Sequence, residues 1–305
     1  MQHLLSLGDC RPQEVLGLLA LAEQVKRDPA RYRQTLAGKT LGMIFQKHST
    51  RTRVSFEVGM CQLGGHALFL AEAALQISRG ETFDDTARVL GRYVDGIMAR
   101  VKRHRDLELL CGGGVPVING LSDQVHPCQV LADLLTLRER FGELEGRVLT
   151  YLGAGNNMAH SLLVGCCKVG MQVRVATPPE YPADPAVVRS VVAAGGDVVV
   201  TDDPVAAATD ADALYTDVWV SMGEESERAQ RMERLAPYRV DLGLLGRAKP
   251  SAVFMHCLPA HRGEEVTGDV IDHDRSVVFD EAENRLHAQK AVLVHLLGGV
   301  DLPSV

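Results

Sequence analysis

The residues best suited to chemistry form a run of hydroxyl and guanidinium groups, His-Ser-Thr-Arg-Thr-Arg at 48–53. An apolar stretch, residues 40–45, precedes the run, and a segment with helical spacing follows it and ends at Gly64-Gly65. The pattern predicts a strand, a short loop and a helix that begins within the run. A helix N-terminus offers unpaired N–H groups and partial positive charge, and Arg51 adds a two-pronged donor for phosphate oxygens. The run fits a phosphate site, and taken alone it fits an ordinary N-cap with a solvated basic turn equally well.

His126 and Gln129 open another predicted helix, residues 127–141, and share one face near its positive end. There the imidazole could polarise a carbonyl group, and the amide could accept a hydrogen bond from an amide nitrogen. Capping with surface exposure is the simpler interpretation of this pair in isolation.

Asp217 closes a predicted strand, residues 213–217, and Ser221, Met222 and Gly223 follow it. A carboxylate at the carboxyl end of a strand, with a serine in the loop, suits an amine-bearing ligand. The charged segment 224–234 would then serve as a mobile flap. A plain exit from strand to loop explains the pattern as well.

The segment His-Cys-Leu-Pro-Ala-His-Arg-Gly-Glu-Glu at 256–265 follows the predicted strand 253–258. Cys257 fits a buried core position or a Cys–His nucleophile. A zinc site from His256, Cys257 and His261 is disfavoured, because adjacent strand residues point to opposite faces.

Gly153-x-Gly155, followed by Asn156 and Asn157, is only part of a dinucleotide-binding motif. Met158 stands where the third glycine belongs, and no acidic residue clearly ends the next strand. The pattern favours a tight strand-to-helix turn. Residues 283–285, Glu-Asn-Arg, are predicted to cap the last helix.

Composition limits the class of protein. The chain has 305 residues, 46% apolar and 23% charged, as expected of a two-domain globular protein. Its net charge of -7 disfavours nucleic acid or an anionic membrane as the main partner. Seven cysteines without small-domain spacing, and no apolar run long enough to span a bilayer, predict reduced thiols and a cytoplasmic protein.

The elements that must position these residues alternate between strand and helix patterns, which predicts parallel sheets with right-handed crossovers. Helices are predicted at 11–27, 127–141 and 286–297 and near 86–90 and 158. Strands are predicted at 40–45, 66–70, 96–101, 115–119, 147–152, 172–176, 197–201, 213–217, 253–258 and 277–279.

The motifs together, in this order, resemble the aspartate and ornithine carbamoyltransferases over essentially the whole chain. Ser-Thr-Arg-Thr-Arg at 49–53 and His-Pro-x-Gln at 126–129 resemble motifs of the whole family. Asp217 with Ser-Met-Gly at 221–223, and His-Cys-Leu-Pro at 256–259, resemble the ornithine branch. One departure is Gly-Ala-Gly at 153–155, where many relatives have an acidic residue in the middle.

The resemblance implies an α/β fold of two domains, each a mainly parallel sheet flanked by helices, with a C-terminal helix that returns to the first domain. The implied boundaries are 1–133 for carbamoyl phosphate, 134–285 for ornithine and 286–305 for the returning helix. The implied carbamoyl phosphate-binding positions are Ser49, Thr50, Arg51, Thr52, Gln76, Arg100, His126, Gln129, Cys257, Leu258 and Arg285. The implied ornithine-binding positions are Asn157, Asp217, Ser221 and Met222. The positions implied in catalysis are Thr52, Arg100, His126 and Cys257.

The implied reaction is direct attack of the ornithine δ-amine on carbamoyl phosphate, through a tetrahedral intermediate, to give citrulline and phosphate. No metal or organic cofactor is expected, and neither is a nucleic acid or membrane partner. The resemblance also implies a homotrimer or an assembly of trimers, with Gln76 lent to a neighbouring subunit. We expect the clusters around Arg51 and Cys257 to meet across a crevice.

Three competing functions are weighed against this one. The nearest is a carbamoyltransferase for another amine, such as putrescine or an acylated ornithine. The others are a dinucleotide-dependent dehydrogenase and an anion-binding protein without catalysis.

Overall fold

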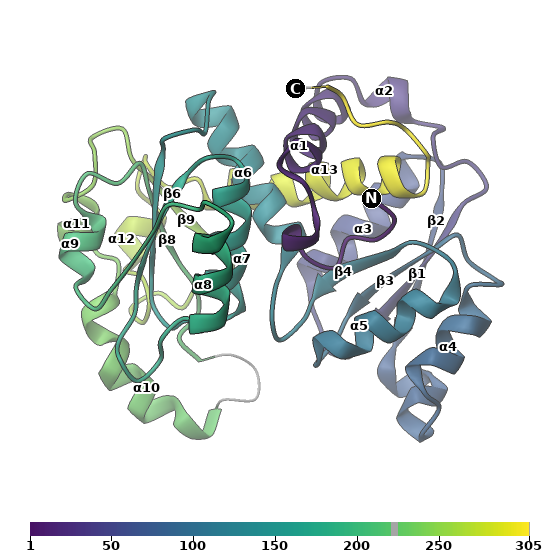
Figure 1. Cartoon of the computed structure of the whole chain (residues 1–305), viewed down its shortest axis with the longest axis horizontal. Coiled ribbons are helices and arrows are strands. Elements are labelled where there is room, and N and C mark those ends of the chain that lie inside the picture. Colours follow the sequence, from purple (N-terminus) through teal and green to yellow (C-terminus); the bar gives the residue numbers. More distant parts are fainter. Residues whose placement is uncertain (221–224, 305) are drawn as a thin grey trace. The chain divides into compact units, whose positions relative to one another are not determined.

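The computed structural model describes residues 1–220 and 225–304 of the chain. The chain forms two compact units. Unit 1 comprises Met1–Leu135 with Glu283–Val305, and unit 2 comprises Thr136–Ala282. Each unit contains one parallel sheet with helices packed on it, and Figure 1 labels the elements.

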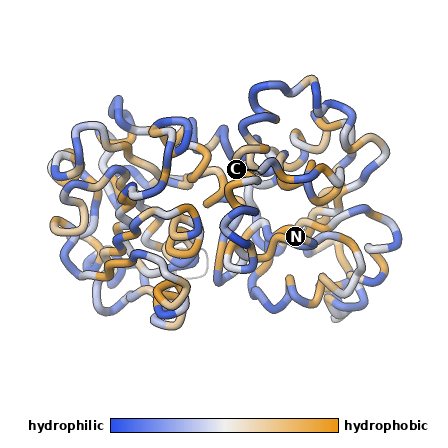
Figure 2. The backbone as a smooth tube through the Cα atoms, turned by 45° about the horizontal axis from the view of Figure 1, so that its top comes forward, coloured by the Kyte–Doolittle hydropathy of each residue, from blue (hydrophilic) through white to orange (hydrophobic). Residues whose placement is uncertain are grey.

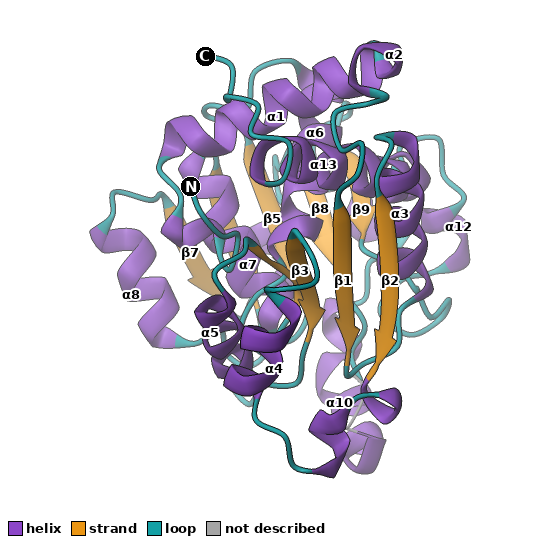
Figure 3. Ribbon diagram, turned by 90° about the vertical axis from the view of Figure 1, so that its right-hand side faces the viewer, coloured by secondary structure: helices purple, strands orange, loops and turns teal. Residues whose placement is uncertain are grey.

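The sheet of unit 1 has the order β2-β1-β3-β4, and all its strand pairs are parallel. Figure 3 shows β1, β2 and β3 pointing the same way. The chain leaves β1 towards β2 on one side and then returns to build β3 and β4 on the other. This reversal makes a switch point between β1 and β3, where ligands of such sheets bind. The strands are β1 (Thr40–Phe45), β2 (His66–Ala71), β3 (Gly96–Arg100) and β4 (Val117–Leu121).

Helices cover both faces of this sheet, so its inner strands β1 and β3 are buried along nearly their whole length, whereas the edge strand β2 is partly exposed. Apolar residues of β1, β3 and β4 form one core cluster with α4 and α5. Helix α3 packs closely on α13: the absence of a side chain at Gly59 allows this approach, since a Cβ there would lie only 3.3 Å from Lys290 Cγ. The helices are α1 (Pro12–Arg27), α2 (Pro29–Tyr32), α3 (Thr50–Gln62), α4 (Phe83–Leu90) and α5 (His104–Leu110), with the 3-10 turns η1 (Leu7–Asp9), η2 (Glu72–Ala74), η3 (Gln76–Arg79) and η4 (Cys111–Gly113).

The sheet of unit 2 has the order β7-β6-β5-β8-β9, again with parallel pairs only. Its switch point lies between β5 and β8. Leu152 pairs with Thr216, and Thr216 with His256, so three strands end in register at one edge. The strands are β5 (Val148–Leu152), β6 (Gln172–Ala176), β7 (Val198–Thr201), β8 (Ala213–Thr216) and β9 (Val253–His256).

The core of unit 2 gathers apolar side chains from the strands and short helices around the buried Trp219 and Phe254. Figure 2 shows the hydrophilic stretches of backbone concentrated in the outer turns. The helices are α7 (Asn157–Lys168), α8 (Pro185–Ala193), α9 (Pro204–Ala208), α10 (Arg228–Leu235), α11 (Leu242–Leu245) and α12 (Gly268–Ile271), with the 3-10 turns η5 (Glu225–Glu227) and η6 (Ala236–Tyr238).

Two helices contribute residues to both units, α6 (Pro127–Phe141) and α13 (Val278–Leu296). In unit 1, α13 lies beside α1, and Lys26 Nζ donates to Asn284 Oδ1 at 2.9 Å. The predicted fold class, including the return of the last helix to the first part of the chain, is confirmed.

Two predictions of secondary structure are wrong near the C-terminus. Residues 277–279 are not a strand, because α13 begins at Val278. Residues 283–285 consequently lie inside this helix and do not cap it. Three apolar residues, two of them β-branched, look like a strand, but Asp280 and Glu281 place acidic groups in the first turn, which favours a helix.

Strand β9 also ends two residues earlier than predicted, at His256. Leu258 has φ 55°, in the left-handed region, and Pro259 has no N–H group for a ladder. None of the described helices is long and apolar enough to span a lipid bilayer.

Candidate functional site

In unit 1 the predicted anion-binding turn opens helix α3. Ser49 is its N-cap, and the Ser49 Oγ accepts a hydrogen bond from the Thr52 N–H at 3.3 Å. The cap takes one of the four N–H groups that a helix start leaves unpaired, so capping and anion binding are compatible here. Thr50 is exposed, Arg51 is half-buried and Thr52 is buried.

A buried guanidinium group connects Thr52 to residues far along the chain. Arg285 Nη2 donates to Thr52 Oγ1 at 3.3 Å, and Arg285 Nη1 donates to Gln129 Oε1 at 2.7 Å. Arg285 Nε donates to Gln289 Oε1 at 3.0 Å, and Gln129 Nε2 donates to Asp133 Oδ1 at 2.8 Å. Helices α3, α6 and α13 thus bring three of the predicted residues, Thr52, Gln129 and Arg285, into one network.

His126 and Arg100 are buried in the same unit. Arg100 closes β3, and its carbonyl accepts from the Gln46 N–H at 2.9 Å. Burial, and next the positive charges of Arg285 and Arg100, hold the pKa of His126 well below its usual 6.5. The imidazole is therefore uncharged at neutral pH and suited to polarising a carbonyl as a neutral group.

Gln76 lies apart from this network within the described part of unit 1. It is exposed at the start of η3, and its carbonyl accepts from the Glu81 N–H at 3.1 Å within the same turn.

In unit 2 the ends of β5, β8 and β9 bring Asp217 together with Asn156 and Cys257. Asp217 follows β8, and its Oδ1 accepts from the Val218 N–H at 2.8 Å and from Cys257 Sγ at 3.1 Å. Its Oδ2 accepts from Asn156 Nδ2 at 2.8 Å. Asn157 is half-buried at the first position of α7.

Two buried carboxylates fix the loop that carries Cys257 and Leu258. Glu281 Oε2 accepts from the His256 N–H at 3.0 Å. Glu265 Oε1 accepts from the His261 N–H at 2.6 Å and lies 3.1 Å from His256 Nε2. Because His256 Nδ1 accepts from the Leu258 N–H at 2.8 Å, we assign the ring proton to Nε2.

The same contacts keep Glu265 ionised. Burial raises the pKa of Glu265, but the hydrogen bonds from His256 and His261 outweigh it, and the net shift is downward. The loop is therefore tied at both ends to one charged group.

The possible metal ligands lie closer together than the sequence suggested. Ligand atoms of Asp217, His256 and Cys257 lie within 4.8 Å of one another. Cys257 is beyond the last residue of β9, so the alternation of a strand no longer separates it from His256. Both ring nitrogens of His256 nevertheless have protein partners.

A second group, His261, Glu264 and Glu265, is similarly compensated. Glu264 forms an ion pair with Arg228, and Glu265 bonds His256. Protein contacts account for both groups, and we assign neither to an ion.

Two predicted positions, Ser221 and Met222, lie outside the described residues, and so does the start of the predicted flap. From residue 225 onward this charged segment is helical, forming η5 and α10.

The glycine turn after β5 serves chain packing. A Cβ on Gly155 would lie 2.1 Å from the Ala183 N, so only glycine allows the segment at 182–183 to pass. Asn156 caps α7, as its Oδ1 accepts from the Met158 and Ala159 N–H groups. The turn interpretation is confirmed.

Sequence reasoning gave no functional role to several residues that support the site. Asp133 and Gln289 lie four residues after Gln129 and Arg285, on the same helix face, which is a usable signal. Asn156 and Glu265 offered no comparable signal, since Asn156 meets a carboxylate 61 residues away.

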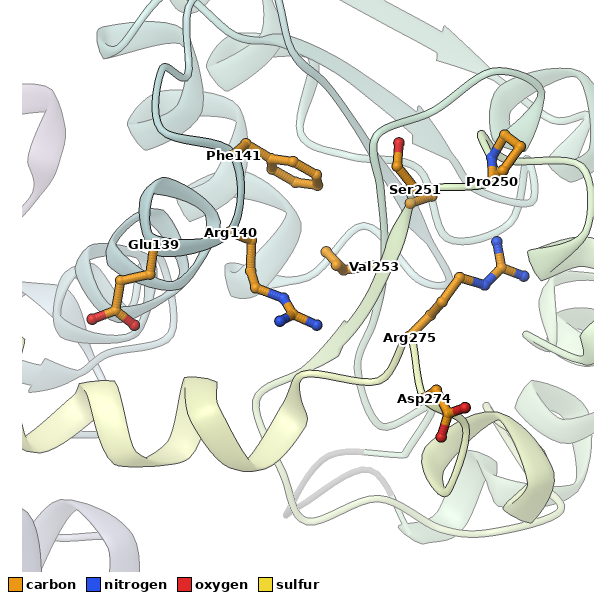
Figure 4. Close-up of a pocket in the computed structure, with 9 residues that line it drawn as sticks. Glu139, Arg140, Phe141, Pro250, Ser251, Val253, Asp274 and Arg275 are labelled. Atoms are coloured by element: carbon orange, nitrogen blue, oxygen red, sulfur yellow. The ribbon is translucent and has the colours of Figure 1, made fainter.

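A cavity of about 320 Å³ in unit 2 lies elsewhere (Figure 4). Val253, the first residue of β9, lines it, so it lies at the amino end of that strand, whereas Cys257 follows the carboxyl end. Arg275, another lining residue, donates to the Lys249 and Leu245 carbonyls. The remaining lining residues are Glu139, Arg140, Phe141, Pro250, Ser251, Ala252 and Asp274.

Parallel sheets with polar clusters at the ends of their strands define a ligand-binding α/β protein. Residues 2–139 match the aspartate/ornithine carbamoyltransferase carbamoyl-P binding domain. Residues 145–296 match the Asp/Orn binding domain of the same family. The chain belongs to the aspartate/ornithine carbamoyltransferase family, and the resemblance of its motifs is thereby confirmed.

Individual relatives match over nearly the whole chain. The chain is 55% identical to an ornithine carbamoyltransferase of Pyrococcus abyssi, over 98% of this chain and 96% of the relative. It is 53% identical to an ornithine carbamoyltransferase of Methanoculleus marisnigri, over 97% of this chain and 96% of that relative. The structure of ornithine carbamoyltransferase from Pyrococcus furiosus superposes with a TM-score of 0.94, at 53% identity, over 98% of each chain.

Proposed function

We propose that this chain is an enzyme that transfers the carbamoyl group of carbamoyl phosphate to the δ-amine of L-ornithine, giving citrulline and phosphate. Relatives named for this enzyme match nearly all of the chain, and the activity predicted from the motifs is confirmed at that level. The observation that carries the chemistry is the buried network of Thr52, Gln129 and Arg285 in the unit that also buries a neutral His126.

Unit 1 supplies the groups for the carbamoyl phosphate. The start of α3, with Ser49, Thr50, Arg51 and Thr52, offers N–H groups, hydroxyls and a guanidinium for the phosphate. Arg100 also faces the phosphate in this proposal.

The carbonyl oxygen of the carbamoyl group accepts from Thr52, Arg100 and His126. These groups are buried, so donors aimed at the oxyanion act in a medium of low dielectric constant. Gln129 and the Leu258 backbone take the amide nitrogen, with Arg285 holding Gln129 in place.

Unit 2 supplies the groups for ornithine, namely Asn157, Asp217, Ser221 and Met222, and Cys257 lies near the attacking δ-amine. The neutral δ-amine attacks the carbonyl carbon to form the tetrahedral intermediate. The C–O bond to phosphate then breaks, and phosphate leaves with the bonding electrons. The amine proton goes to the Asp217 carboxylate, either directly or by way of the Cys257 thiol, which takes it up as it passes its own proton to Asp217 Oδ1 at 3.1 Å.

The proposal includes residues 1–133 as the carbamoyl phosphate domain, 134–285 as the ornithine domain and 286–305 as the returning segment. It further includes a homotrimer or assembly of trimers in which Gln76, which is exposed, completes a neighbouring site. A cytoplasmic location is supported by seven free thiols, and biosynthesis of arginine by a relative from Pyrococcus furiosus that is named anabolic.

The test is colorimetric detection of citrulline from carbamoyl phosphate and ornithine, with putrescine and N-acetylornithine as parallel acceptors. We expect carbamoylation of ornithine alone. Carbamoylation of another amine in preference to ornithine would replace the substrate, and no product with any amine would refute the proposed function.

A further inference from the structure

Asn156 lies in the glycine turn that follows β5, directly before the predicted ornithine-binding residue Asn157. Asn156 Nδ2 donates to Asp217 Oδ2 at 2.8 Å, across the switch point between β5 and β8. We propose that Asn156 is a positioning residue that sets the orientation of the Asp217 carboxylate towards the ornithine amine. This proposal rests on the proposed function and adds a residue to its amine site.

The direction of the Asn156 amide is fixed by its surroundings. Its Oδ1 accepts from the Met158 N–H at 2.9 Å and from the Ala159 N–H at 3.1 Å. Both are backbone donors at the start of α7 and can be satisfied only by an oxygen. The amide NH2 group must therefore point to Asp217, and the donor–acceptor pair has one arrangement.

Tyr151 supports this arrangement from β5. Its hydroxyl lies 3.1 Å from Asn156 Oδ1 and 3.0 Å from the Ala154 carbonyl oxygen. Burial, then the neighbouring Asp217 and Cys257, raise the pKa of Tyr151 well above 10, so the phenol stays protonated and acts as a donor. The Asn156 oxygen thus faces two backbone N–H groups and a hydroxyl whose single proton it shares with the Ala154 carbonyl oxygen.

The contacts leave the carboxylate oriented and still able to bind an amine. Asp217 Oδ1 accepts from Val218 and Cys257, and Oδ2 accepts from Asn156. An ionised carboxylate has about four acceptor positions. Three donors fix its plane and leave capacity for an ornithine ammonium or amine.

The decisive variant is Asn156→Asp, which has nearly the same shape and remains a good N-cap, but replaces the NH2 donor with a carboxylate oxygen. We expect kcat/KM for ornithine to fall roughly a hundred-fold, the loss typical of a misplaced reacting group. The KM for carbamoyl phosphate should stay within about twofold, because the Asn156 side chain contacts Tyr151, Asp217 and the first N–H groups of α7, none of which is assigned to that substrate.

The pH profile separates positioning from a structural role. In Asn156→Asp, two carboxylates face each other. Their charges repel, so this pair binds one proton at a higher pH than a single carboxylate does. The shared proton restores a hydrogen bond to Asp217. The ratio of Asn156→Asp to wild-type kcat/KM for ornithine should therefore rise as the pH is lowered.

Two further variants control for the helix cap. Asn156→Ser keeps an N-cap oxygen, but its hydroxyl is shorter than the amide and does not reach Asp217. This variant should lose roughly tenfold in kcat/KM for ornithine, the worth of one hydrogen bond to a charged group. Asp203→Ala removes the cap of α9, whose Oδ1 accepts from the Val205 and Ala206 N–H groups, and should leave ornithine kinetics unchanged.

The positioning role would be overturned if Asn156→Asp had wild-type kinetics with ornithine. It would also be overturned if this variant lost equally with both substrates, unfolded at a lower temperature and kept the wild-type pH profile. Wild-type enzyme that makes no citrulline would instead refute the proposed function.

Discussion

At the scale of single residues, two neighbouring arginines, Arg51 and Arg53, have different surroundings. Arg51 is half-buried at the start of α3, whereas Arg53, two residues on, is exposed and bound to Glu57 at 2.9 Å. Arg53 also lies over the Phe69 ring, 3.8 Å from its centroid. Only the first of these two guanidinium groups is assigned to the phosphate.

The variant Arg51→Ala should weaken binding of carbamoyl phosphate by roughly tenfold to a hundred-fold, the worth of a hydrogen bond between charged groups. Isothermal titration calorimetry measures this directly. Arg53→Ala is the matched control and should bind like wild type. Equal affinity in Arg51→Ala and wild type would remove Arg51 from the site.

The variant Cys257→Ala removes the thiol that contacts Asp217. We expect a higher KM for ornithine and a lower kcat, because the thiol lies next to the carboxylate proposed to meet the amine. Steady-state kinetics with each substrate varied in turn checks this. Wild-type values would exclude Cys257 from the reaction.

The depressed pKa of His126 makes stability depend on pH. Below about pH 6.5 the unfolded chain protonates this histidine while the folded chain does not, so the unfolded state binds more protons. The free energy of unfolding should therefore fall as pH drops below 6.5, until the folded pKa is reached. Urea unfolding at several pH values, with His126→Gln showing a smaller slope, checks this, and identical slopes would contradict it.

At the scale of elements, prediction was accurate where local signals mark both ends of a segment. The bounds of β1, β6 and α6 agree with the sequence prediction, since apolar runs and a Pro–Gly bracket define them locally. Helices such as α5, α11 and α12 have seven residues or fewer and went unpredicted. In such short segments tertiary packing, not local preference, decides the structure.

For the candidate site as well, local patterns were predictable from the sequence and tertiary contacts were not. Motifs within a few residues, such as the start of α3, could be recognised from the sequence. The Asn156–Asp217 and Arg285–Thr52 contacts join residues 61 and 233 apart and arise only from strand order and helix packing. The contact of Asn156 with Asp217 could therefore not be predicted from the spacing of residues in the sequence.

The turn between β5 and α7 offers a test at this scale. Gly155→Ala would place a methyl group 2.1 Å from the Ala183 N, which the backbone can relieve only by moving. We expect a loss of about 1–3 kcal/mol in the free energy of unfolding. Denaturant titration measures it, and unchanged stability would show that the segment at 182–183 yields freely.

At the scale of the whole molecule, the chain divides its polar chemistry between two parallel sheets. Unit 1 has donors suited to a phosphate and an oxyanion, and unit 2 has a carboxylate and thiol suited to an amine. The proposed reaction consumes one substrate of each kind. Its central claim is that both sets of residues serve a single turnover.

A bisubstrate analogue tests this claim most directly, with a phosphonoacetyl group on the δ-nitrogen of ornithine in place of the carbamoyl phosphate. Calorimetry of the wild type should give one molecule bound per chain. Arg51→Ala in unit 1 and Asp217→Asn in unit 2 should each weaken that binding at least roughly tenfold. Full affinity in either variant would contradict the claim that the two sets of residues bind the two halves of one reaction.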